Sequence, residues 1–296
     1  MTSVIARAST RDGIRLLTRH WPAGSPGDGA ALTRHWPEHA PGGAVLLVHG
    51  LGEHSGRYEE VGDRFAAAGL ETFAWDQRGF GASGGEQAFV ADWSRFHDDL
   101  QDRLAATRAA VPGRPVVLYG HSMGGLIALG YCVSDRPLPD LLVLSAPGID
   151  DNLARWKRIV APILARVAPR LRIANGISAS MLSRDAERQA AVQADPLVQS
   201  KSTTRFGALA FAEQARVRGE AARLSIPTLV IHGESDPIVP VAATEALGHL
   251  PGVTRETYPG VRHELHNEPE GPRVLTDVIT WIDARLAEAG VAPGAV

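Results

Sequence analysis

Short apolar runs and longer amphipathic segments alternate along most of the chain. The apolar runs are continuous, as expected for strands that are buried on both faces of a parallel sheet. The segments between them repeat apolar residues at the spacing of a helix face. This order predicts an α/β protein with a mostly parallel sheet and helices on both sides. The predicted strands are residues 44–48, 70–75, 116–119, 141–145, 228–231 and 253–258, and the predicted helices are residues 57–68, 92–110, 126–133 and 274–287.

A hairpin is predicted before this alternation begins. Residues 4–8 and 14–21 are joined by Asp12-Gly13, a pair typical of a tight turn. The sequence LTRHWP at residues 17–22 occurs a second time at residues 32–37. We interpret this as a local duplication, because one repetition is too little for a solenoid. We expect one copy to form the second strand and the other to lie in a loop.

The alternation stops in the middle of the chain. Apolar residues at helical spacing are here accompanied by cations, with no acidic residue from 152 to 172. We predict that residues 149–224 form a helical cap, or lid, inserted in an α/β core made of residues 1–148 and 225–296. Pro162 lies within the first cap helix and predicts a break or a kink there.

The surface of this cap helix has two interpretations. In the first, the helix packs on the core and exposes a solvated basic face. In the second, it is also a lid that makes transient contact with an anionic, lipid-rich membrane surface. Exposed leucines on such a helix would equally suit dimerisation, so we expect a monomer or a homodimer.

The motif GHSMG at residues 120–124 lies between a predicted strand and a predicted helix. A G-x-S-x-G motif in that position is typical of a nucleophile elbow, a tight turn that presents a serine hydroxyl above the sheet. The turn holds the serine in a sparsely populated backbone conformation, and side chains at the two glycines would collide with the adjoining strand or helix. We therefore predict that Ser122 is a nucleophile.

A serine nucleophile needs a base that takes its proton and a carboxylate that orients the base. In this architecture the acid and then the histidine follow the serine along the chain. Asp236 and His263 follow the last two predicted strands in that order. We predict that Asp236 orients the imidazole and that His263 is the general base and then the general acid. Asp150 as the acid and His266 as the histidine stay open as alternatives.

The oxyanion of a tetrahedral intermediate needs hydrogen-bond donors. One donor is the backbone N–H of the residue after the nucleophile, here Met123. The second comes from the loop after the strand at residues 44–48, where we predict the N–H of Leu51. Losing one such donor costs on the order of 10²–10³ in rate.

Three further histidines, His49, His121 and His232, lie beside glycines at predicted strand ends, where histidine usually bonds to local backbone groups. Histidines and acidic residues are nowhere spaced like a convincing metal site. We therefore expect neither a metal nor a cofactor.

Five segments resemble motifs of the monoacylglycerol lipase and lysophospholipase group of α/β-hydrolases, within the serine aminopeptidase S33-type family. Residues 49–58, HGLGEHSGRY, resemble the oxyanion loop of this group and are far more selective than the elbow alone. Residues 76–83, 120–125, 195–198 and 262–268 resemble the next strand-end motif, the elbow, a cap motif and the histidine loop. The resemblance covers most of the chain and implies the α/β-hydrolase fold with an inserted helical cap.

The resemblance also implies hydrolysis of a monoacylglycerol, a lipid ester, to a fatty acid and glycerol through an acyl-enzyme on Ser122. It implies that Glu53, Arg57 and His266 line a pocket for the glycerol hydroxyls, directly or through water. Alternatively, Glu53 and Arg57 form only an ion pair at a helix start, since they are spaced i and i+4. The acyl chain is expected under the apolar face of the cap, next to Leu153, Trp156 and Ile163.

Other functions stay open at this stage. General carboxylesterases and lysophospholipases share every catalytic part. Serine aminopeptidases would need carboxylates in the cap, where Glu187 and Asp195 are the candidates. From another class, a non-catalytic ligand-binding receptor on this scaffold would be expected to lose a catalytic group. Ser122 itself argues against relatives of this fold that attack with aspartate.

Composition and charge add exclusions rather than new functions. The net charge of −3 and the lack of a basic stripe interleaved with aromatic residues argue against a nucleic-acid partner. Cys132 is the single cysteine, which excludes an intramolecular disulfide, and we expect it to be a small buried side chain. The first ten residues lack the apolar core of a signal peptide, and no stretch reaches transmembrane length, so we expect a cytoplasmic protein, with peripheral membrane association if the cap contacts lipid.

Overall fold

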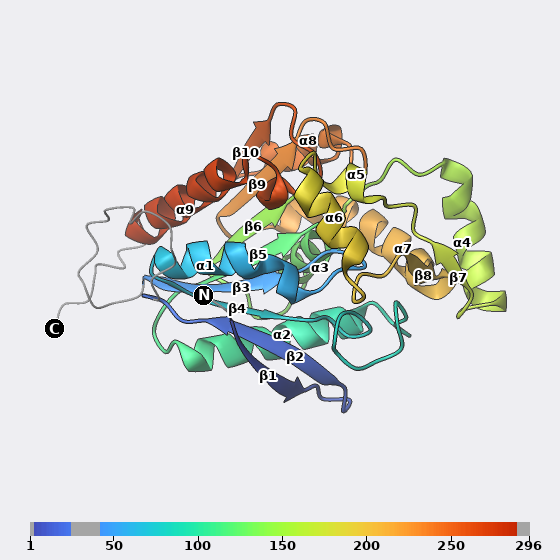
Figure 1. Ribbon diagram of the computed structural model, residues 1–296, viewed down its shortest axis with the longest axis horizontal. Coiled ribbons are helices and arrows are strands. Elements are labelled where there is room, and N and C mark those ends of the chain that lie inside the picture. The colour runs from blue at the N-terminus through green and yellow to red at the C-terminus, as the bar shows by residue number, and fades with distance from the viewer. Residues whose placement is uncertain (1–2, 25–41, 289–296) are drawn as a thin grey trace.

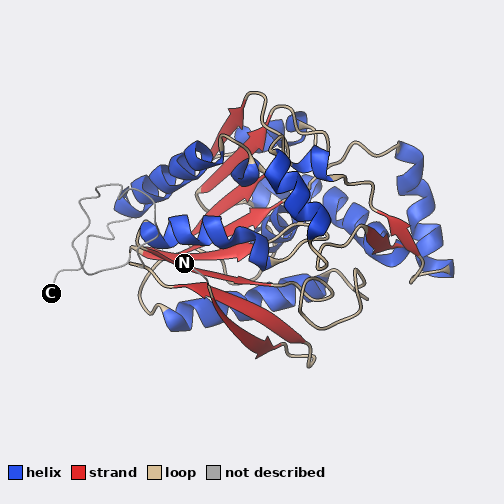
Figure 2. Ribbon diagram, viewed as in Figure 1, coloured by secondary structure: helices blue, strands red, loops and turns tan. Residues whose placement is uncertain are grey.

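The computed structural model describes residues 3–24 and 42–288, and an eight-stranded sheet forms its centre (Figures 1 and 2). The strand order is β1-β2-β4-β3-β5-β6-β9-β10. β1 and β2 form the predicted antiparallel hairpin, β2 is also antiparallel to β4, and the other neighbours are parallel. The predicted mostly parallel α/β sheet is confirmed. The strands are β1 (Val4–Ser9), β2 (Arg15–Trp21), β3 (Gly43–Val48), β4 (Leu70–Trp75), β5 (Val116–His121), β6 (Leu141–Ser145), β9 (Thr228–Gly233) and β10 (Val253–Tyr258).

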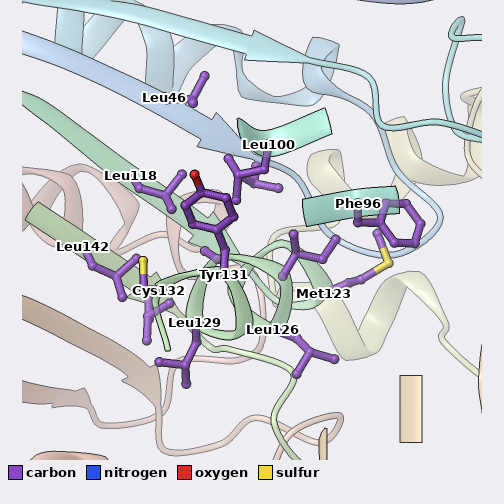
Figure 3. Close-up of a cluster of buried hydrophobic side chains, with 14 of the residues drawn as sticks. Leu46, Phe96, Leu100, Leu118, Met123, Leu126, Leu129, Tyr131, Cys132 and Leu142 are labelled. Atoms are coloured by element: carbon purple, nitrogen blue, oxygen red, sulfur yellow. The ribbon is translucent and has the colours of Figure 1, made fainter. Parts of the chain in front are cut away.

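Helices cover both faces of this sheet, with α1 and α9 on one face and α2 and α3 on the other (Figure 1). Successive side chains of a strand point to opposite faces. Leu46 of β3 therefore packs with α2 and α3, and Leu47 packs with α1 and α9. Figure 3 shows the cluster of apolar side chains between the sheet and α2 and α3, in which Cys132 is buried as predicted. These helices are α1 (Glu59–Ala67), α2 (Ser94–Ala110), α3 (Met123–Cys132) and α9 (Gly271–Glu288), and shorter ones are α8 (Glu245–Gly248) and the 3₁₀ turns Ser55–Tyr58, Ala221–Arg223, Val241–Thr244 and Leu265–Asn267.

The differences from the sequence prediction are mostly at element ends. α3 begins at Met123 rather than at residue 126, because packing at the elbow outweighs the low helix propensity of its glycines. The helix predicted over residues 57–68 begins as a 3₁₀ turn and becomes α1 at Glu59. The first LTRHWP copy lies in β2 and the turn after it, and the second copy, residues 32–37, lies outside the described residues.

The chain leaves the sheet after β6 and returns at β9, its parallel neighbour, and the predicted cap, residues 149–224, lies within this excursion. α4 runs through Pro162 as one helix, so the proline does not end it. A two-stranded sheet of β7 and β8, which we did not predict from sequence, lies beside α4 at the right-hand end of the molecule in Figure 1. None of the helices within residues 3–24 and 42–288 is both long and apolar enough to span a bilayer. The elements of this segment are α4 (Arg155–Val167), β7 (Arg172–Ala174), α5 (Ala179–Leu182), α6 (Ala186–Ala194), β8 (Lys201–Thr203) and α7 (Thr204–Glu220).

Candidate active site

Ser122 lies on the turn from β5 to α3, with φ 52° and ψ −118°. A positive φ is rare for a residue other than glycine, and here the turn is held by the Ser122 amide, which donates to the Ser145 carbonyl over 3.0 Å. A Cβ at Gly124 would lie 2.1 Å from the Val48 carbonyl oxygen, and one at Gly120 would lie 2.5 Å from the Gly124 carbonyl oxygen. Both glycines are therefore needed for the helix to start this close to the sheet.

The structure brings Ser122, His263 and Asp236 into one chain of hydrogen bonds. The Ser122 hydroxyl lies 2.8 Å from Nε2 of His263, and Nδ1 of His263 lies 2.7 Å from Oδ2 of Asp236. Since Asp236 is an acceptor, Nδ1 carries the proton and Nε2 is left to accept from the serine. The amides of Ile238 and Val239 donate to the other Asp236 oxygen over 2.8 and 3.0 Å and hold the carboxylate in place. This arrangement can move a proton from the serine to the imidazole.

The electrostatics suit a histidine that accepts a proton. Burial lowers the pKa of His263, but the charge and hydrogen bond of Asp236 outweigh it, so the net pKa is raised above its ordinary value. Burial alone would raise the pKa of Asp236, yet His263 and His232, with the backbone amide of Val239, bring it well below its usual range. The carboxylate therefore stays ionised at neutral pH and stabilises a protonated imidazole.

The alternative residues lie elsewhere. The Asp150 carboxylate pairs with Arg158 over 2.7 Å, while Nδ1 of His263 is occupied by Asp236. His266 is stacked on the Tyr58 ring, with centroids 4.8 Å apart. The structure thus places neither Asp150 nor His266 in the hydrogen-bonded chain.

The two predicted oxyanion donors border the same space as the serine. Leu51, Ser122 and Met123 all line one cavity. Met123 is the first residue of α3, where backbone amides have no partner within the helix and the helix dipole favours negative charge. Within the described residues, the amides of Leu51 and Met123 donate no hydrogen bond. Both donors are thus free to meet an oxyanion.

A small cavity with a mixed lining adjoins Ser122, and we call it the polar cavity for the charged side chains that border it. It has a volume of about 60 Å³, and Glu53, Arg57 and Glu264 line it. Arg57 donates to Glu53 over 2.9 Å and to both oxygens of Glu264 over 2.6 and 2.8 Å. Tyr58 also donates to Glu53 over 2.6 Å. Glu53 and Arg57 therefore form the ion pair expected from their spacing and also border the cavity, so the two interpretations are compatible.

His266 differs from the expectation that it lines this cavity. It is 4% exposed and lies against Tyr58 and against His121, whose ring centroid is 5.2 Å away. Within the described residues neither ring nitrogen has a hydrogen-bond partner. Burial, together with the nearby His121, lowers the pKa of His266 to about 3, so the ring is neutral. His266 therefore does not line the polar cavity, and its role in binding glycerol stays a prediction.

A larger apolar cavity of about 520 Å³ also adjoins Ser122, and its volume is within the range of ligand pockets. As expected, Leu153 and Trp156 line it, but Ile163 does not: its side chain is 61% exposed on the outer face of α4. The helix has turned Ile163 outward because Val160 and Leu164 occupy the inner face. The apolar lining includes Leu51, Met123, Leu126, Val160, Leu164, Ile177, Met181, Phe206, Phe211, Ile238 and Val239.

Four residues of the site were not identified from the sequence. His232, which we interpreted as a local structural residue, has Nε2 3.2 Å from Oδ2 of Asp236 and is a second partner of that carboxylate. Glu264 anchors Arg57, and its position directly after His263 was the available signal. The cap residues Asn175 and Gln199, which line the polar cavity, carry no sequence motif that marks them as pocket residues.

A serine on a strained strand–helix turn, hydrogen-bonded to a histidine and an aspartate from later loops of a mostly parallel sheet, defines the protein as an α/β-hydrolase. The family model described as serine aminopeptidase, S33 (Hydrolase_4) matches residues 39–270. The chain belongs to this family.

Known proteins of similar sequence include monoacylglycerol lipases. A monoacylglycerol lipase of Mycolicibacterium smegmatis is 37% identical over 245 residues, which cover 81% of this chain and 87% of that protein. A human monoglyceride lipase is 33% identical over 295 residues, which cover 95% of this chain and 91% of that protein.

Solved structures share the fold. A soluble variant of the Saccharomyces cerevisiae monoglyceride lipase, in complex with a substrate analogue, superposes with a TM-score of 0.84 at 24% identity and covers 96% of each chain. A carboxyl esterase from Bacillus coagulans, in complex with glycerol, has a TM-score of 0.74 at 20% identity and covers 97% of this chain and 99% of its own.

Proposed function

We propose that the protein is a carboxylic ester hydrolase that cleaves monoacylglycerols to a fatty acid and glycerol. The names of its relatives support this substrate class, and one feature of the site supports it most directly. Ser122 lies where a small polar cavity meets a large apolar one. An ester bond at this junction would place a glycerol group beside Glu53 and Arg57 and an acyl chain beneath α4.

In the proposed mechanism His263 takes the Ser122 proton as the serine oxygen attacks the ester carbonyl. The resulting oxyanion accepts hydrogen bonds from the amides of Leu51 and Met123. His263 then returns the proton to the departing glycerol oxygen, which leaves an acyl-enzyme on Ser122. A water molecule, activated by the same histidine, releases the fatty acid and restores the serine. Asp236 keeps the imidazole in the required tautomer throughout.

Aminopeptidase activity has less support in this site. A free amine would need an uncommitted carboxylate in the pocket. Of the two cap candidates, Asp195 is hydrogen-bonded to His54 over 2.8 Å, and Glu187 is exposed on α6. Neither lines the two cavities described above.

The cap, residues 149–224 in our proposal, also has a surface suited to transient contact with an anionic lipid layer. On α4, Ile159, Ile163 and Val167 are 72%, 61% and 75% exposed, so the outer face is largely apolar rather than only basic. Exposed Lys157 and Arg166 lie on the same helix. We expect co-sedimentation with anionic vesicles to exceed that with neutral ones, and Ile159→Glu to weaken both.

The test of the proposed function is kcat/KM on a matched panel: monoacylglycerols of several chain lengths, a lysophospholipid, a triacylglycerol, an alkyl ester and an aminoacyl amide. Ser122→Ala serves as the blank and is expected to lose about 10⁶ in turnover, by analogy with serine protease triads. A monoacylglycerol preferred over the alkyl ester of the same acid would support the proposal. Equal kcat/KM values on the monoacylglycerol and on the alkyl ester would indicate a general carboxylesterase. If a fluorophosphonate does not label the folded protein, the protein is a ligand-binding receptor instead.

A further inference from the structure

The loop that carries the Leu51 amide is held on both sides of that amide. The Gly50 amide donates to Oε1 of Glu53 over 2.5 Å, and the Gly52 carbonyl accepts from the Gln199 amide over 2.7 Å. The first partner belongs to the core and the second to the cap. The direction in which the Leu51 N–H points therefore depends on both parts of the protein.

Contact between this loop and the cap is close. Gly52 has φ +74°, and a Cβ on it would lie 2.3 Å from the Gln199 carbonyl oxygen. That carbonyl accepts from the Asn175 side chain over 3.1 Å, and the Gln199 side chain donates to the Gly79 carbonyl over 3.1 Å. Gln199 is thus fastened to the core at two points, and Gly52 fits against it only because it lacks a side chain.

A side-chain pair a few residues away makes the same connection. Nε2 of His54 lies 2.8 Å from Oδ2 of Asp195, and Nδ1 of His54 accepts from the Gly56 amide over 3.2 Å. Because Nδ1 is an acceptor, Nε2 carries the proton and donates it to Asp195. The other Asp195 oxygen accepts from the Leu197 amide over 2.8 Å and starts the turn that leads to Gln199.

The charge of Asp195 is consistent with this role. Burial raises its pKa, but the hydrogen bonds from His54 and the Leu197 amide outweigh burial and lower it. Asp195 is therefore an ionised acceptor at neutral pH, and a charge-assisted hydrogen bond to His54 is stronger than a neutral one.

We propose that the cap segment 195–200 positions the oxyanion loop, with Asp195 acting through His54 and the Gln199 amide acting through Gly52 to aim the Leu51 N–H. Asp195 and His54 are positioning residues, since neither touches the reacting atoms. This inference rests on the proposed ester hydrolysis, but not on the glycerol group. The proposal assigns a function to the aspartate of the Asp195-Pro196-Leu197 motif. It also makes contact between the cap and the oxyanion loop a condition for catalysis.

The test compares the kcat and KM of Asp195→Ala, His54→Ala and the double variant on p-nitrophenyl butyrate. This ester has no glycerol group, so the result does not depend on which lipid is the substrate. A misaimed oxyanion donor should lower kcat about 10- to 100-fold with KM within about twofold, and the double variant should lose no more than the single ones. Affinity for a trifluoromethyl ketone, which forms a tetrahedral adduct, should fall by the same factor as kcat/KM. Affinity for the matching secondary alcohol should not change.

Controls separate positioning from general loosening of the cap. Arg170→Ala removes a cap–core ion pair, with Glu86 at 3.0 Å, in which no residue of 49–58 or 195–200 takes part, and it should leave kcat unchanged. His54→Gln keeps a donor toward Asp195 and should recover part of the activity that His54→Ala loses. This pair of variants tests the proposal even if Asp195→Ala does not fold. The proposal is overturned if Asp195→Ala keeps wild-type kcat and ketone affinity, if ketone and alcohol affinities fall equally, or if Arg170→Ala causes the same loss. A wild-type protein inactive on every ester would instead contradict the proposed function.

Discussion

Arg57 forms a two-pronged ion pair with Glu264, the residue that directly follows His263, with N–O distances of 2.6 and 2.8 Å. Burial disfavours the charged form of Glu264, but the charge and hydrogen bonds of Arg57 outweigh it and lower its pKa to about 2. Glu53 also binds Arg57, so one guanidinium faces two carboxylates beside the polar cavity. His121 and His266, both with a pKa of about 3, add no positive charge. While His263 is neutral, Glu53, Glu264 and Arg57 together give the border of the cavity one net negative charge.

This charge predicts discrimination against anionic head groups. Lysophosphatidic acid should be hydrolysed at least about 100-fold less efficiently than the monoacylglycerol of the same chain, because its phosphate would be desolvated beside like charges. Glu264→Gln should narrow this ratio of kcat/KM values at least 10-fold, since one unit charge at about 10 Å and an effective dielectric of about 20 is worth roughly 1.7 kcal/mol, and more at shorter range. The ratio of kcat/KM values is the measurement. Glu60→Gln, on the exposed face of α1, is the matched control, and an unchanged ratio in Glu264→Gln would contradict the argument.

The pH dependence of activity follows from His263. In the proposed mechanism the neutral form of His263 is the base, and Asp236 raises the pKa of His263 against the effect of burial. Activity should therefore fall as the pH drops through the pKa of His263, which lies above its ordinary value of 6.5. A single protonation, that of His263, is enough to block the reaction. Asp236→Asn should lower this midpoint and reduce kcat about 10⁴-fold, as in the serine protease triad. A profile of kcat/KM against pH with a wild-type midpoint at or below 6.5 would show that Asp236 does not control this histidine.

The sequence was sufficient for the sheet, the elbow and the order of Ser122, Asp236 and His263, because these depend on local patterns and chain order. It was insufficient where the role of a side chain depends on the packing of distant segments. Ile163 matched the apolar face of α4, yet the inner face is set by how α4 sits on α7. The partnership of Asp195 with His54, 141 residues apart, has no local signal.

His266 illustrates the same limit and gives a stability prediction. Its ring is buried against Tyr58 and has no hydrogen-bond partner within the described residues, so burying its nitrogens costs free energy. His266→Phe keeps an aromatic ring there and should leave the free energy of unfolding unchanged or raise it by up to about 1–2 kcal/mol. Its kcat/KM on monoacylglycerol should stay within a few-fold of wild type. A raised KM with normal stability in urea unfolding would instead show that His266 binds the glycerol group.

The elbow glycines provide a final prediction with an internal control. A Cβ at Gly124 would lie 2.1 Å from the Val48 carbonyl oxygen, and backbone of a central strand cannot move aside cheaply. Gly124→Ala should therefore cost more than about 3 kcal/mol of stability or prevent folding. Gly219 lies on the exposed surface of α7, where a Cβ would meet no neighbouring atom within 4 Å, so Gly219→Ala should stabilise the protein by about 0.5–1 kcal/mol. Thermal and urea unfolding of both variants measure the contrast. If Gly124→Ala were as stable as Gly219→Ala, α3 would have room to move away from β3. The close approach of α3 to β3, and with it the strained conformation of Ser122, would then not be a requirement of the site.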